Sequence, residues 1–130
     1  MKVRRSFNRL GIGIVPFLFL CQNGFGQTRL MHHMPPSNGI IGEDLTLSAA
    51  TLEVTNPIDA TLYYRLPDGE SYLEIPFHKT GFNWEVTIPG FGLTEAGLEY
   101  VIAFKFSRDR VVSFPMDDPF NHPHHLTIIP

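Results

Sequence analysis

Five histidines are the residues of this sequence whose type and grouping could bind a metal ion. They form two groups, one near the expected start of the mature chain and one before its last apolar run: His32, His33, His122, His124 and His125. Neutral imidazole is a good ligand for zinc, copper or nickel, and Asp117 or Asp118 could add a carboxylate. Such a site requires three ligands that converge about 2 Å from one ion. The simpler interpretation is a set of exposed loop histidines beside Pro35, Pro36 and Pro123.

A second kind of site would use aromatic rings that stack on the faces of sugars. The candidates lie in the middle of the chain: Tyr63, Tyr72, Phe82 and Trp84. The pattern Trp-x-Val-x-Ile from Trp84, followed by Gly-x-x-Tyr from Gly97, resembles that of starch- and glycogen-binding modules, which are also β-sandwiches. Those modules usually display more than one tryptophan, whereas this chain has one. Because Trp84 shares a strand face with Val86 and Ile88, the competing interpretation places it in the core.

The sequence carries no motif that predicts catalysis. The glycines of Gly90–Gly92 are followed by neither a Lys-Ser/Thr pair nor a helix, so they do not form a phosphate-binding loop. No Gly-x-Ser-x-Gly elbow is present, and no pair of acidic residues has a spacing typical of a glycosidase. Adjacent acids such as Asp117 and Asp118 are typical of a solvated turn. We therefore expect a protein that is not an enzyme and uses no cofactor.

The charge of the chain is distributed unevenly. Its 130 residues suffice for one domain and carry a net charge of −3. Residues 1–26 contain four basic residues and no acidic one, so residues 27–130 hold six basic and thirteen acidic residues, a net charge of −7. A protein that binds nucleic acid needs a basic face. The acidic body therefore argues against a nucleic-acid partner.

Residues 1–26 are typical of a secretory signal peptide. Basic residues come first, an apolar run from Leu10 to Cys21 follows, and Gly24 and Gly26 supply the small residues that a signal peptidase reads. A membrane span needs about 20 apolar residues, so the pattern predicts cleavage before Gln27 rather than a retained anchor. We expect an exported protein of the periplasm, cell surface or extracellular space, with no membrane span once the leader is removed.

The body of the chain, residues 27–130, shows the alternation that is typical of β-strands. Apolar residues occupy every second position over residues 98–106, which matches the opposite faces of successive strand residues. Turn-forming groups such as Pro67-Asp68-Gly69 separate the alternating runs. Strands are expected at about 30–34, 43–54, 60–66, 71–77, 82–88, 97–106, 110–115 and 125–129. Seven or eight antiparallel strands in about 100 residues predict a single all-β sandwich domain.

Three segments carry a resemblance to a known kind of module. They are Ala60–Arg65 (ATLYYR), Trp84–Pro89 (WEVTIP) and Gly97–Ala103 (GLEYVIA). In this order they resemble the immunoglobulin-like and fibronectin type III-like modules of bacterial secreted and surface proteins, over about residues 33–129. The resemblance implies a non-catalytic spacer or adhesion module, which is usually part of a longer polypeptide.

Tyr100 is a candidate for a structural role in such a sandwich. Near the start of a late strand, a tyrosine can bury its ring and donate its hydroxyl to the backbone a few residues upstream, which is the tyrosine corner. The alternative for Tyr100 is plain core packing.

These observations predict an exported, non-catalytic module for protein interaction or spacing. It would act alone or as the N-terminal piece of a larger surface protein, with a protein partner or a neighbouring domain. A regular, exposed edge strand without a pocket would favour this function, although the loop over residues 117–125 could block such an edge. A glycan-binding surface around Trp84 and a histidine-rich metal-binding rim remain the alternatives.

Overall fold

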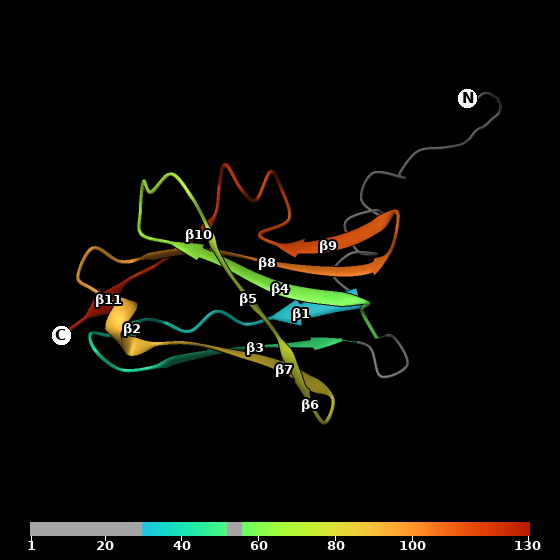
Figure 1. Ribbon diagram of the computed structural model, residues 1–130, viewed down its shortest axis with the longest axis horizontal. Coiled ribbons are helices and arrows are strands. Elements are labelled where there is room, and N and C mark those ends of the chain that lie inside the picture. The colour runs from blue at the N-terminus through green and yellow to red at the C-terminus, as the bar shows by residue number, and fades with distance from the viewer. Residues whose placement is uncertain (1–29, 52–55) are drawn as a thin grey trace, which may run out of the picture.

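The computed structural model of the protein describes residues 30–51 and 56–130 (Figure 1). The predicted signal peptide, residues 1–26, lies outside these residues. Within the described ranges, no helix has the length and apolar character that a membrane crossing requires.

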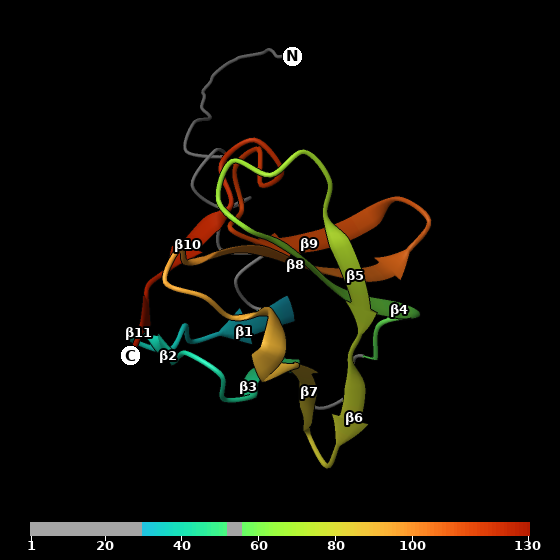
Figure 2. The same cartoon turned by 60° about the vertical axis from the view of Figure 1, so that its left-hand side comes forward.

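Two main sheets pack face to face (Figures 1 and 2). The first has the order β1 (Met31–His33), β3 (Leu45–Thr51), β7 (Asn83–Ile88) and β6 (His78–Thr80). The second has the order β10 (His124–Leu126), β8 (Leu98–Ser107), β4 (Asp59–Arg65) and β5 (Leu73–Pro76), and β9 (Arg110–Phe114) also pairs with β8. The first order corresponds to strands A, B, E and D of immunoglobulin domains, and β10, β8 and β4 of the second sheet correspond to strands G, F and C. The predicted all-β, immunoglobulin-like sandwich is thereby confirmed.

A short parallel pair, β2 (Gly39–Ile40) with β11 (Ile128–Ile129), links the beginning and the end of the described chain. The N–H of Gly39 donates to the carbonyl of Thr127 at 2.9 Å, and the N–H of Ile41 donates to that of Ile129 at 2.8 Å. The strand expected over 125–129 is therefore divided at Thr127, because its first half pairs with β8 and its second half with β2.

The described residues hold eleven strands rather than seven or eight. Division of the last strand is one reason. Another is that the chain runs from β5 directly into β6 and changes sheet at Phe77 (Figure 2). In addition, β2 has only two residues, too few to show an alternation.

The hydrophobic core lies between the facing sides of the two sheets. Four alternate residues of β8 point inward and are fully buried: Leu98, Tyr100, Ile102 and Phe104. The ring of Phe104 meets the edges of Phe77 and Trp84, with ring centroids 5.3 and 6.0 Å away. Full burial of one such side chain contributes about 1.5–3 kcal/mol, so this long strand organises the core.

The two long sides of the sandwich are closed differently. On one side, the crossing from β5 to β6 buries Phe77, whose N–H donates to the carbonyl of Ala60 at 2.9 Å. On the other side, the β2–β11 pair joins one end only. At the other end the edge strands β1 and β9 belong to different sheets, and the candidate site lies between them.

Candidate functional site

A cavity of about 340 Å³ lies between the edge strands of the two sheets. One wall comes from β1 and the other from β9 with the two residues that follow it; the lining is Met31, His32, His33, Val112, Ser113, Phe114, Pro115 and Met116. Most of these side chains are apolar. The cavity is therefore suited to an apolar group that enters between the sheets, and we call it the β1–β9 cleft.

His33 forms part of the cleft wall and is held at both ring nitrogens. Its Nδ1 lies 2.7 Å from the carbonyl oxygen of Ser48, and its Nε2 lies 2.8 Å from the hydroxyl of Tyr100. Because a carbonyl can only accept, Nδ1–H donates to Ser48. In the neutral ring the other nitrogen, Nε2, carries no proton and accepts from the Tyr100 hydroxyl. This pattern requires the neutral ring.

Burial sets the protonation of these groups. It lowers the pKa of His33, although the bond to Ser48 opposes this effect, and the nearby rings of His124 and His32 lower that pKa further. Burial also raises the pKa of the Tyr100 hydroxyl. The imidazole and the phenol are both neutral at physiological pH as a result.

His124 joins the same aromatic cluster from β10. Its ring centroid lies 5.2 Å from that of Tyr100 and 5.3 Å from that of Phe114. The ring of His33 lies 4.9 Å from Phe114. Burial lowers the pKa of His124, and the neighbouring His125 adds to this effect. His33, Tyr100, Phe114 and His124 thus form one packed group, which we call the His33 cluster.

The five candidate metal ligands do not converge among the described residues, where no group of three metal-ligating side chains is found. Both nitrogens of His33 are occupied by protein atoms. His122 is exposed and lies with its Nδ1 3.6 Å from a carboxylate oxygen of Asp118, while His32 and His125 are exposed on β1 and β10. The histidines are therefore divided between a packed cluster and separate surface positions.

Tyr100 is fully buried, and its hydroxyl bonds to the side chain of His33. A tyrosine corner would instead place that hydroxyl on the backbone a few residues upstream. The contact joins β8 of one sheet to β1 of the other, so Tyr100 combines core packing with a polar link between the sheets. The alternation of Met31 with His33 is the sequence signal that could have predicted an inward-facing histidine.

The four aromatic candidates for glycan binding lie on different surfaces. Trp84 is half-buried on β7 and packs against the core, and its buried indole nitrogen has no hydrogen-bond partner among the described residues. Phe82, in the turn before β7, is 73% exposed. Tyr63 and Tyr72 belong to the second sheet and its β4–β5 connection. These residues do not form one aromatic platform around Trp84.

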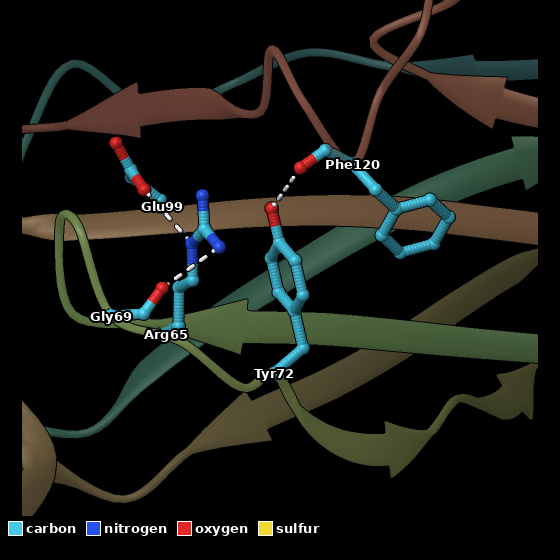
Figure 3. A network of polar contacts seen from close by, with 5 residues as sticks. All are labelled: Arg65, Gly69, Tyr72, Glu99 and Phe120. Carbon is cyan, nitrogen blue, oxygen red and sulfur yellow. Dashed lines mark hydrogen bonds and ion pairs between the residues drawn. The ribbon is translucent and has the colours of Figure 1, made fainter.

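Tyr63 and Tyr72 instead bind a loop of their own chain. The ring of Phe120, in the segment 115–123 between β9 and β10, lies 5.1 Å from Tyr63 and 5.4 Å from Tyr72. The Tyr72 hydroxyl donates to the carbonyl of Phe120 at 2.9 Å (Figure 3). Val101 on the same outer face is fully buried. The loop therefore covers the outer face of the second sheet. The sequence had suggested that it could block a strand edge.

Arg65 supports the same arrangement (Figure 3). Its guanidinium carbon lies 4.4 Å from the centre of the Tyr72 ring, and its Nε donates to Glu99 at 3.1 Å. A second nitrogen of Arg65 donates to the carbonyl of Gly69 at 2.9 Å. These contacts fix the β4–β5 connection beside the loop.

Comparison with known proteins gives likenesses in structure but none in sequence. No protein-family model matches the sequence, and no curated protein matches it. Among solved structures, the chain is similar to the crystal structure of the swine CD8aa homodimer, with 13% sequence identity and a TM-score of 0.48. The alignment covers 78% of this chain and 98% of that one.

Proposed function

We propose that this protein is an exported, non-catalytic module for protein interaction or spacing, of the kind found in bacterial secreted and surface proteins. The observation that carries the proposal is the outer edge of β9, which pairs with no described strand other than β8. From the sequence we expected such an edge without a pocket, whereas here the apolar β1–β9 cleft lies beside it. A titratable residue in its wall, His33, is held by Ser48 and Tyr100 at both nitrogens. The cleft is therefore suited to binding a side chain and not to proton transfer by His33.

A strand edge beside the cleft supports a protein as the ligand. Among the described residues, β9 pairs with β8 and with no other strand. An unpaired edge presents backbone donors and acceptors that pair with an extended segment of another chain. Backbone pairing would supply affinity, and the neighbouring cavity would supply selectivity.

Export is supported by the order of basic, apolar and small residues before Gln27. We expect the N-terminal sequence of the purified mature protein to begin at Gln27, and the protein to fractionate outside the cytoplasm. An intact Met1 on a cytoplasmic protein would contradict this part of the proposal.

Crosslinking in the producing cells tests the interaction. A photoreactive amino acid placed at Met116 in the cleft wall should give a discrete crosslinked species of defined mass. The matched control is the same probe at Glu95, which is exposed in the connection before β8. The proposal fails if neither position gives a product, or if both give the same products.

A further inference from the structure

We propose that the outer edge of β9, which pairs with no described strand other than β8, binds an extended acidic segment of a partner protein as an added strand. This inference rests on the proposed interaction function and names the chemistry of the partner. It combines the strand edge, the cavity beside it and a local concentration of positive charge.

The edge has the length and exposure that strand addition requires. Five residues of β9 span about 17 Å at 3.4 Å per residue. Val111 is 53% exposed on this strand, while Val112 points inward into the core. A segment aligned along β9 would pair with backbone groups that β8 leaves unused.

The β1–β9 cleft would then select an apolar residue in the added strand. Alternate side chains of that strand point to opposite faces of the sheet, so every second one would point between the two sheets. There it would meet Met31, Phe114 and Met116 in a cavity of about 340 Å³. One water occupies roughly 30 Å³ of liquid, so the cavity is large enough for a bulky side chain.

The charges of this protein near β9 indicate which side chains the added strand carries between its apolar positions. The hairpin that joins β8 to β9 carries Lys105, Arg108 and Arg110, all exposed, together with a single acid, Asp109. These are three of the five basic residues in the described part of a strongly acidic body. Asp59 lies opposite Lys105 on β4, and Asp117 and Asp118 follow the far end of β9. Because exposed charges are screened beyond about 8 Å at physiological ionic strength, Arg108 and Arg110 dominate at the hairpin end of the β9 edge. An acidic segment is therefore the complementary partner.

Synthetic peptides test this assignment on the purified protein. The probe is a seven-residue peptide in which glutamate alternates with leucine or valine, and the first control replaces every glutamate with lysine. The second control keeps the acidic sequence but carries N-methyl groups on alternate backbone nitrogens, which abolishes strand pairing. Fluorescence anisotropy should show binding of the acidic peptide, affinity reduced by added salt, and little binding of either control.

Charge reversal on the protein locates the site. The double variant Arg108→Glu, Arg110→Glu should weaken binding of the acidic peptide by about twofold to thirtyfold, the range for two exposed ion pairs. The matched control is Lys79→Glu, because Lys79 is an exposed cation on β6 at the edge of the other sheet. It should leave the affinity unchanged.

Several results would overturn the inference. They are equal affinity for the acidic and lysine peptides, undiminished binding of the methylated peptide, an equal effect of Lys79→Glu, or no binding of any peptide. A protein dimer that dissociates on the double charge reversal would identify a second copy as the occupant and would also overturn it. If the Met116 crosslink persists while peptide binding fails, the proposed function stands and only the acidic-strand assignment falls.

Discussion

At the scale of single residues, His33 shows how one side chain joins the two sheets. Its ring accepts from Tyr100 on the second sheet and donates to Ser48 on the first. The type of this residue could be read from the sequence, but its partners could not, because they are brought together only when the sheets pack. Grouping with the other histidines suggested a metal ligand, whereas the alternation with Met31 was the more informative pattern.

The stability of the protein should fall as the pH drops below 6.5. The pKa of His33 lies below its ordinary value of 6.5 because burial disfavours the charged ring, and burial lowers that of His124 in the same way. Well above pH 6.5 both rings are neutral in the folded and in the unfolded state, so the protein keeps its full stability. As the pH falls below this value, the unfolded chain takes up protons first and the folded state loses stability.

Urea denaturation at several pH values between about 7.5 and 5.5 measures this loss, in a range above the ordinary pKa of carboxyl groups. The variant His122→Gln, at an exposed position, should keep the same dependence. The double variant His33→Gln, His124→Gln should flatten it. A dependence that His122→Gln abolishes would refute the assignment to the His33 cluster.

Removal of the Tyr100 hydroxyl should also destabilise the fold. Tyr100→Phe leaves the buried Nε2 of His33 without its donor, and an unsatisfied buried group costs about 1–3 kcal/mol. The control is Tyr72→Phe. The Tyr72 hydroxyl donates to the Phe120 carbonyl at an exposed position, so water can satisfy that carbonyl in the variant. Equal losses in the free energy of unfolding for the two variants would contradict a special role for the His33 contact.

At the scale of elements, the alternating runs predicted the long strands well, and the short pieces were missed. β8 has ten residues, and its alternation is visible in the sequence. β2 and β6 have two and three residues, so their existence depends on pairing partners rather than on their own pattern. The sequence suggested that the loop over residues 117–125 could block a strand edge, but Phe120 fixes it on the face of the second sheet. Such a contact between distant residues has no local signal.

The Phe120 ring should therefore contribute to stability more than its exposure suggests. Phe120→Ala removes two edge-to-face contacts, with Tyr63 and Tyr72, each worth about 0.5–1.5 kcal/mol beyond burial. We expect a loss of about 1–3 kcal/mol in the free energy of unfolding. Phe91→Ala is the matched control, because Phe91 is 92% exposed, and it should change the stability by less than about 0.5 kcal/mol. Similar losses for the two variants would show that the loop does not stabilise the sheet.

At the scale of the whole molecule, a single core joins both sheets, which predicts one cooperative unfolding transition. Trp84 reports on it, because the indole packs against Phe104 in the core. We expect a blue-shifted emission from the folded protein and a red shift on heating, with the same midpoint as the loss of far-ultraviolet circular dichroism. Red-shifted emission from the folded protein would place Trp84 in solvent. It would then support the alternative of a glycan-binding surface around Trp84. Separate midpoints would contradict a single cooperative unit.

The parallel pairing of β2 with β11 has a mechanical consequence. If the module is stretched from its two ends, the chain before β2 and the chain after β11 are pulled in opposite directions along the strands. The backbone bonds from Gly39 to Thr127 and from Ile41 to Ile129 then bear the load together, in shear, instead of opening one after another. A module held by this parallel pair resists tension until both backbone hydrogen bonds break together. A spacer between two anchored partners needs this resistance to stretching.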